Sequence, residues 1–413
     1  MLTTALIDRL PEAGDGGSDL RGRWHLIFGR ILASLGRHRS AARHFELAIA
    51  LCPQHLRAHL LLGWSFFQQE QYDKAIFAFE QALQIAPDSA YAHAYRGLSC
   101  LQLERYQEAV YGLERASRIE PRYKNKPRYA ESLGSGYSKL GQFDSALEAY
   151  RSAEQLSPSD PEIALRVGKT LFRLERYEES EAALRRAVSL DPGNADTLYD
   201  LALTLYQLKR FAESISVLKT IAGWTDRADV HIAIAINCKG GERIADAVAE
   251  LKEALRVEPD NSEAYLQLSV IYGEDSKWEE SLAAGKRLAE LRPKDEVGYW
   301  SVAAACQELK QYPEQIDACQ HALQINPNSL PALEGLANAY AETARYEEAA
   351  TALRHALQIS PETPSLRAWL AQCYVESGDL AAAREEQRVL QTLDSGLAAE
   401  VGKRIVTRTE QSY

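Results

Sequence analysis

Proline returns along this chain at a nearly fixed interval, and that interval limits the possible fold more than any other feature. Most gaps between successive block-ending prolines are 34 residues, one is 37, and one of 67 contains two blocks with Asp226 in the missing proline slot. The nine prolines are Pro53, Pro87, Pro121, Pro158, Pro192, Pro259, Pro293, Pro327 and Pro361. A period of this length is typical of a solenoid, in which each repeat buries its apolar face only against its neighbours.

Small residues recur at two places within each block. If the first of eleven blocks begins at Gly22, position 8 is always Gly, Ala or Ser, and position 20 is Ala or Ser except at Gln315. Two helices pack closely only where small side chains let their backbones approach. Larger apolar residues such as Leu60, Trp64 and Phe67 follow helical spacing. Each block is therefore predicted to be a pair of helices, ended by proline, with the next helix capped by residues such as Asp88, Asn194, Asp260 and Asn328.

This pattern resembles the tetratricopeptide repeat family, whose unit is a helix–turn–helix of 34 residues, and the resemblance covers roughly residues 22–395. It implies an all-α, right-handed superhelical solenoid. Residues 396–413 are expected to form a capping helix and tail, because Leu397, Val401 and Ile405 lie on one helical face. Without such a cap the last repeat would expose its apolar side.

Three irregularities divide the array. Extra residues lie within 122–129, the block ending in 221–227 lacks its proline, and Lys239-Gly240-Gly241 occupies a turn. They are either neutral loop variation or changes of superhelical twist. The second alternative predicts repeat stacks at 22–121, 127–226 and 228–395. Outside the array we expect an N-terminal, partly flexible segment at 1–21 and the cap at 396–413. Apolar residues within 2–10 are expected to dock either on the first repeat or on a partner.

Composition favours a soluble cytoplasmic protein. The net charge of −11 argues against general affinity for nucleic acid or anionic membranes. We find no apolar stretch long enough for a transmembrane helix and no secretory signal pattern. The six cysteines form no CxxC motif, and several occupy expected core positions, which indicates free thiols in a reducing compartment.

Known catalytic patterns are missing from the sequence. It contains neither GxxxxGK[ST] nor HExxH, and its nine histidines share no metal-binding spacing. Nearly every residue belongs to a repeat. We therefore expect no catalytic residues, no cofactor-binding residues, no cofactors and no metal site, and hence a protein that is not an enzyme.

The family resemblance implies that function resides on a concave groove lined by the first helix of each repeat, mainly through positions 2, 5, 6, 9, 12 and 13. In the second and third repeats these positions are unusually apolar and aromatic, which favours partner binding. The alternative is that some of these side chains pack inside the solenoid. The predicted residues are Leu60, Leu61, Trp64, Phe67, Tyr91, Tyr95 and Leu98.

Charges at the groove positions are sorted along the chain. Basic residues prevail in the first five repeats and acidic residues in the last six. This is either a solvated face sorted by chance or an electrostatic selector of partners. The basic candidates are Arg128, Lys139, Arg166, Lys169 and Arg173, and the acidic candidates are Glu263, Glu308, Glu334 and Glu342. Neither the carboxylate clamp nor the asparagine ladder known in the family is matched, and only Asn338 lines the groove.

These observations predict a non-catalytic scaffold or adaptor that binds an extended peptide or helix of another protein in its groove. One alternative is a self-assembling scaffold that forms oligomers through its repeats. Another is a regulatory or substrate-recruiting subunit of an enzyme complex.

Overall fold

The computed structural model describes residues 20–411, which form helices joined by short turns, with no strand in that range. The helices are α2 Leu20–Ser34, α3 His38–Leu51, α4 Leu56–Gln68, α5 Tyr72–Ile85, α6 Ala90–Gln102, α7 Tyr106–Ile119, the 3-10 helix η1 Pro121–Tyr123, α8 Pro127–Lys139, α9 Phe143–Leu156, α10 Pro161–Arg173, α11 Tyr177–Leu190, α12 Ala195–Gln207, α13 Phe211–Ala222, α14 Ala228–Gly240, α15 Ile244–Val257, α16 Ser262–Glu274, α17 Trp278–Leu291, α18 Glu296–Glu308, α19 Tyr312–Ile325, α20 Leu330–Glu342, α21 Tyr346–Ile359, α22 Pro364–Ser377, α23 Leu380–Leu393 and α24 Ser395–Gln411. The predicted all-α repeat solenoid is confirmed.

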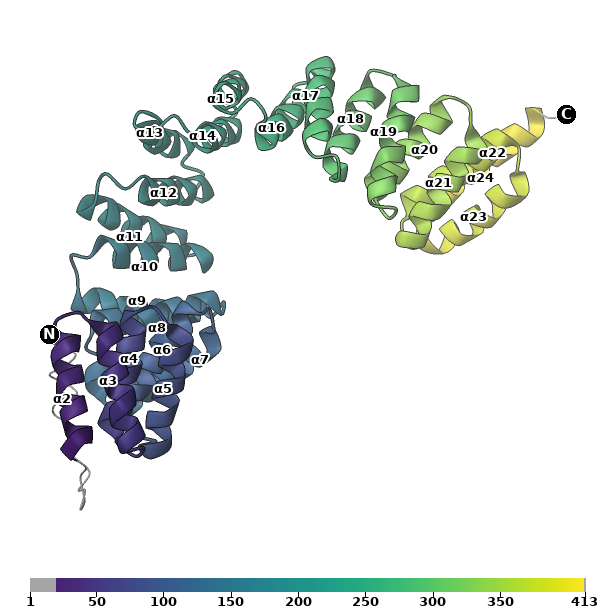
Figure 1. The fold of residues 1–413 in the computed structure, drawn as a ribbon. Coiled ribbons are helices and arrows are strands. Elements are labelled where there is room, and N and C mark those ends of the chain that lie inside the picture. The colour runs from purple at the N-terminus through teal and green to yellow at the C-terminus, as the bar shows by residue number, and fades with distance from the viewer. Residues whose placement is uncertain (1–19, 412–413) are drawn as a thin grey trace. The chain divides into compact units, whose positions relative to one another are not determined.

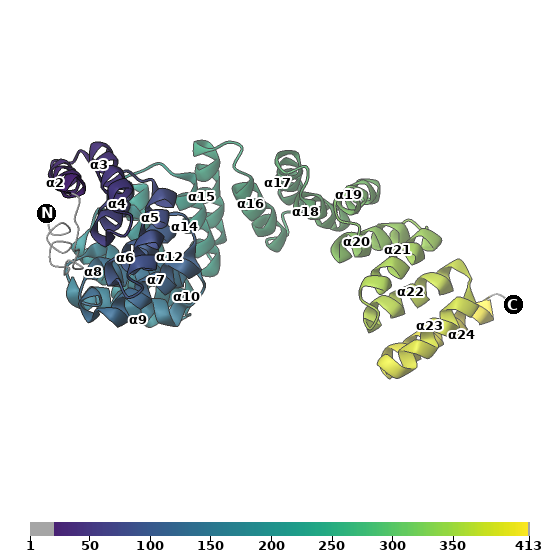
Figure 2. The same ribbon diagram turned by 60° about the horizontal axis from the view of Figure 1, so that its bottom comes forward.

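The helices form two compact units, of residues 1–208 and 209–413. The first contains α2 to α12 and the second α13 to α24, so the boundary falls within the sixth repeat. Within each unit, helices that follow one another in the chain pack side by side, as α18 to α22 do in both views (Figure 1, Figure 2). The division into three stacks inferred from the irregular blocks stays a prediction.

The small residues at positions 8 and 20 stand where the two helices of a repeat touch. A Cβ atom on Gly63 would lie 2.7 Å from the ring of Phe79, which no real contact allows. Where position 20 is serine, its hydroxyl donates to the position 8 carbonyl, as from Ser180 to Gly168 at 2.8 Å. The close approach of the helices, rather than local propensity, therefore dictates these small residues.

The turn between the two helices of each repeat contains a residue in the left-handed backbone region. Position 15 has a positive φ in all eleven repeats, but it is glycine only at Gly36, Gly141 and Gly378. The others are Glu70, Glu104, Glu175, Lys209, Glu242, Ser276, Lys310 and Ala344. A non-glycine residue in this region carries a steric cost, which helix pairing must offset.

Helix capping follows the sequence prediction only in part. Asn194 caps α12 as expected, with its side chain accepting from the Thr197 amide at 2.9 Å. Asp88, Asp260 and Asn328 do not cap, because the N-cap is the next residue along the chain. Asp88 and Asp260 instead form ion pairs with Arg115 of α7 and Arg287 of α17, each on the second helix of the repeat that follows the aspartate.

The two ends of the described chain differ. At the C-terminal end, Ala398, Val401 and Ile405 of α24 pack on α22 and α23, as the capping prediction requires. At the other end, α2 leaves Trp24, Phe28 and Ile31 at least half exposed. The expectation for residues 2–10 falls outside the described residues.

The extra residues after the third repeat form η1 and the turn that follows it. Tyr123 of η1 is buried, and its ring lies against Tyr129 of α8 with centroids 4.8 Å apart. The Lys126 ammonium lies over both rings. The insertion therefore fills its own space with an aromatic plug rather than forming a free loop.

Candidate functional site

The second unit has a pocket on the face made by the first helices of its repeats. Its volume is about 350 Å³, and residues of α18, α20 and α22 line it. They are Trp300, Ala303, Ala304, Gln307, Pro331, Glu334, Gly335, Asn338 and Trp369. Most of them occupy repeat positions expected to face the groove. Ala303, Ala304 and Gly335 are small, so they leave room for a pocket whose lining also includes the indole rings of Trp300 and Trp369.

A buried glutamine sets the orientation of two pocket amides. Gln315 of α19 is fully buried at position 20, where other repeats carry Ala or Ser. Its Nε2 lies 2.9 Å from the Gly335 carbonyl, 3.3 Å from Asn338 Oδ1 and 3.4 Å from Gln307 Oε1. Because both pocket amides turn their oxygens toward this nitrogen, their NH₂ groups are directed away from Gln315.

Most of the apolar and aromatic residues predicted to line the groove of the first unit lie in its core. Leu60, Leu61, Trp64, Tyr91, Tyr95 and Leu98 are buried, and only Phe67 is half-buried. Tyr91 and Tyr95 approach with ring centroids 4.5 Å apart, and Phe67 meets Tyr95 edge-on at 5.5 Å. The expectation of an exposed aromatic surface is therefore wrong, because neighbouring α4 and α6 rings cover one another.

This packing changes what substitutions there would do. Trp64 and Tyr95 belong to the hydrophobic core of the first repeats, so truncating either to alanine would cost folding stability of about 3–5 kcal/mol. The indole Nε1 of Trp64 is buried without a hydrogen-bond partner among the described residues. That these residues contact a partner stays a prediction.

The basic candidates of the first unit are partly neutralised. Arg166 lies 3.2 Å from Glu131 and 3.1 Å from Glu162, and the Lys169 ammonium lies 2.9 Å from Asp200. Arg128, Lys139 and Arg173 are exposed, and none forms an ion pair within residues 20–411. The positive potential available to a ligand therefore comes mainly from these last three.

Of the four acidic candidates in the second unit, two have a partner side chain and two do not. Glu263 lies 3.6 Å from Arg292, and Glu342 accepts from the Tyr312 hydroxyl at 3.3 Å. Glu308 and Glu334 are exposed and have no ion-pair partner in the described part of the chain. Of these four carboxylates, only Glu334 lines the pocket.

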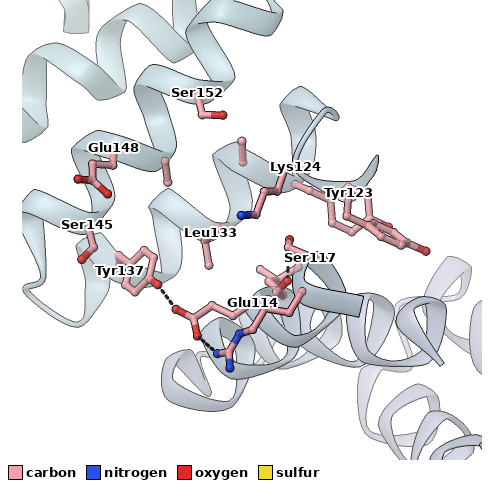
Figure 3. Close-up of a pocket in the computed structure, with 14 residues that line it drawn as sticks. Glu114, Ser117, Tyr123, Lys124, Leu133, Tyr137, Ser145, Glu148 and Ser152 are labelled. Atoms are coloured by element: carbon pink, nitrogen blue, oxygen red, sulfur yellow. Dashed lines mark hydrogen bonds and ion pairs between the residues drawn. The ribbon is translucent and has the colours of Figure 1, made fainter. Parts of the chain in front are cut away.

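A second pocket, of about 410 Å³, opens at the insertion between the third and fourth repeats. It lies between α7, η1, α8 and α9, and the Lys124 side chain extends into it (Figure 3). Glu114 accepts hydrogen bonds there from the Tyr137 hydroxyl and, at 2.7 Å, from Arg118. Burial and this hydrogen bond raise the pKa of Tyr137 to about 12. The positive charges of Lys124 and Arg118 balance the negative charges of Glu114 and Glu148, so the lining favours neither a cationic nor an anionic ligand.

The cysteines are free, and five of the six are buried. Burial raises the pKa of Cys306 and Cys373 to about 11 and that of Cys319 to about 12. These thiols stay protonated near neutral pH, and a protonated thiol is a poor nucleophile. Residues 20–411 contain no cluster of three His, Cys, Asp or Glu side chains suited to hold a metal ion.

Two family models, both described as tetratricopeptide repeat, match this chain. One matches residues 26–90, 68–124, 132–195, 165–228 and 240–296, and the other matches 344–389. The matches extend over well more than half of the sequence. The chain belongs to the tetratricopeptide repeat family. Proteins of this family act broadly as protein-interaction scaffolds, so this general class is assigned to the chain.

Solved tetratricopeptide repeat structures resemble parts of the chain. MamA residues 41 to the end from Desulfovibrio magneticus RS-1 is 17% identical, with 43% of this chain and 98% of that chain covered at a TM-score of 0.39. YrrB, a protein whose structure is titled as having an unusual peptide-binding site, is 20% identical, with 54% and 96% covered at 0.38. A sequence search of curated proteins gives no significant match.

The tetratricopeptide repeat register also places two tryptophans at groove positions that are not among the predicted site residues. Trp300 and Trp369 stand at positions 5 and 6, two of the expected groove positions, but they lie outside the denser aromatic run at 60–98. The buried amide Gln315, the one break in the small-residue rule at position 20, was the available signal.

No helix within residues 20–411 is both long and apolar enough to cross a membrane.

Proposed function

We propose that this protein is a non-catalytic scaffold that binds an extended segment of another protein along the first helices of its repeats. The observation that carries the proposal is the pocket between α18, α20 and α22. It combines two half-buried indoles, a small-residue floor and two amide donors on one face. Apolar pockets with a few fixed polar groups are the usual form of a recognition site.

An extended segment suits this pocket better than a folded surface. Backbone carbonyls of an extended chain need hydrogen-bond donors when they leave water, and the NH₂ groups of Gln307 and Asn338 supply them. The residues that line the pocket would then select among segments by the side chain that each segment places there. The family resemblance supports this mode, and the protonated thiols offer no competing chemistry.

Affinity purification tests the proposal. The intact protein, a groove variant with Trp300→Ala and Glu334→Gln, and an outer-face variant with Glu279→Gln and Glu280→Gln on α17 would be immobilised and exposed to native extract. We expect one or more proteins to be retained by the intact and outer-face forms and lost from the groove variant. Retention of the same proteins by all three forms would exclude the groove as the binding surface.

Self-assembly is a second candidate, which the outer face of α2 favours. The second repeat carries the small buried residues Ala58 and Ser65 at positions 3 and 10, but the first repeat carries Trp24 and Ile31 there, 59% and 51% exposed. A second copy of the chain could cover this face by a twofold contact. Sedimentation of the wild type and of Trp24→Ser/Ile31→Ser tests it: a monomer at all concentrations for both would remove this candidate.

We propose that the protein acts in the cytoplasm and needs no cofactor. Six unpaired cysteines fit a reducing compartment.

A further inference from the structure

We infer that the pocket between Trp300 and Trp369 receives the side chain of a lysine or arginine from the bound segment, with Glu334 as its counter-ion. This assignment rests on the proposed function and names the chemistry that one part of the groove selects. It is carried by three features of the same pocket: the two indoles, one unpaired carboxylate and two oriented amides.

The indoles supply the walls. Trp300 comes from α18 and Trp369 from α22, so the pocket lies between rings that belong to different repeats. Trp369 packs on one side against the core of the last repeats, which fixes its position. Indole faces attract cations more strongly than other aromatic side chains, and the methylene stem of lysine or arginine also packs well on apolar surface. Ala303 and Ala304 leave room for that stem.

The charge of the pocket is one-sided. Glu334 is the only ionisable side chain among the lining residues that the structure describes. Cations on nearby helices are already engaged, since Lys286 lies 2.6 Å from Glu314, and Arg345 lies over the Tyr340 ring and 2.9 Å from Glu348. Glu334 therefore faces the pocket without an internal partner, and a basic ligand side chain would complete the pair.

The amides add a backbone contact next to this cation site. Gln315 holds the oxygens of Gln307 and Asn338, so both amides present donors to the pocket. A peptide carbonyl beside the inserted side chain would accept from them. Gln315 is thus a positioning residue, which acts on the ligand only through the two amides.

Fluorine NMR of the full chain tests the assignment. The protein would be labelled with 5-fluorotryptophan, and the Trp300 and Trp369 signals would be assigned with Trp300→Phe and Trp369→Phe variants. The probes are short acetylated and amidated peptides of serine and alanine around one central residue: arginine, lysine, norleucine or glutamate. We expect the arginine and lysine peptides to shift both signals with an affinity about tenfold higher than that of the norleucine peptide.

Matched variants separate charge from shape. Glu334→Gln should weaken binding of the basic peptides several-fold and leave the norleucine peptide unchanged. Glu308→Gln, on the same face but outside the pocket, should bind like the wild type. Gln315→Ala restores the residue common at position 20, so it should fold normally, yet it should weaken the arginine and norleucine peptides alike because the amides lose their orientation.

The outcomes distinguish this inference from the proposed function. Equal binding of the basic and norleucine peptides would overturn the cation site and leave peptide binding in the groove intact. Stronger binding of the glutamate peptide would also overturn it. If no peptide shifts either tryptophan signal at concentrations of about 5 mM, where even millimolar affinity is visible, neither the cation site nor the groove proposal stands for this unit.

Discussion

Single residues in this protein carry two different constraints, one of space and one of backbone conformation. The space constraint keeps position 8 small, because a side chain at Gly134, for example, would meet the Tyr150 ring at 2.7 Å. The conformational constraint acts at position 15, where the chain turns back with a positive φ. The first left a clear pattern in the sequence, whereas the second is met mostly by residues other than glycine.

The conformational constraint predicts a stabilising substitution. Ala344 has a φ of 58°, and replacing it with glycine removes the clash of its Cβ. The relief exceeds the entropy that glycine adds to the unfolded chain, so stability should rise by about 0.5–1 kcal/mol. Urea and thermal unfolding midpoints measure this. The control is Ala249→Gly on the exposed face of α15, which should lose about 1 kcal/mol; equal losses in both variants would contradict the strain.

Sequence alone could predict the repeat, its helices and its small residues, because close packing leaves few choices at Gly63 or Ala146. It could not predict the left-handed turn, since Glu70 and Lys310 carry no signal for a positive φ. Nor could it decide whether Trp64 and Tyr91 would be buried, because a side chain at a groove position can face either the groove or the core between neighbouring repeats. The capping helix α24 could be predicted, because the apolar side of the last repeat would otherwise be exposed to water.

At the scale of helices, tight pairing predicts sensitivity to added volume. Ala146 on α9 is completely buried beside Leu147, Tyr150 and Val167. Ala146→Leu should therefore destabilise the first unit by about 1–3 kcal/mol through overpacking. The unfolding midpoint of the variant would be compared with that of Ala182→Leu, at an exposed site on α11. An unchanged midpoint for Ala146→Leu would mean that α8 and α9 separate more easily than their contacts indicate.

The contact between α7 and α8 predicts a dependence on alkaline pH. Burial and the hydrogen bond to Glu114 raise the pKa of Tyr137 to about 12, above the value of about 10 in an unfolded chain. The folded state then binds the proton more tightly, so this contribution is complete below pH of about 10 and declines as pH rises toward 12. The stability difference between wild type and Tyr137→Phe, followed by urea unfolding, should shrink over that interval. A constant difference would contradict the shift.

At the scale of the whole molecule, the groove positions are predicted to be basic in the first five repeats and acidic in the last six, so each part of the groove should attract charges of the opposite sign. Arg128 and Arg173 are two of the three exposed basic candidates that form no ion pair within residues 20–411, the third being Lys139. Reversing both to glutamate should slow association of a fluorescent acidic peptide and flatten its salt dependence, because solvated charges act mainly on the encounter rate. Reversing Arg166 and Lys169 should have a smaller effect on the rate, since acidic neighbours already pair with them. Equal kinetics for wild type and both variants at low salt would make the sorted charges a solvated face.

The central claim is that a partner lies along the first-helix face, and site-specific photo-cross-linking tests it most directly. A photoreactive benzoylphenylalanine would replace Ala304 in the pocket and, as a control, the exposed Ala249 on α15. After irradiation in native extract, mass spectrometry identifies the cross-linked peptides. The account predicts cross-links from position 304 to one extended partner segment that contains a lysine or arginine, and none of these from position 249. Cross-links of that partner only from position 249 would contradict it.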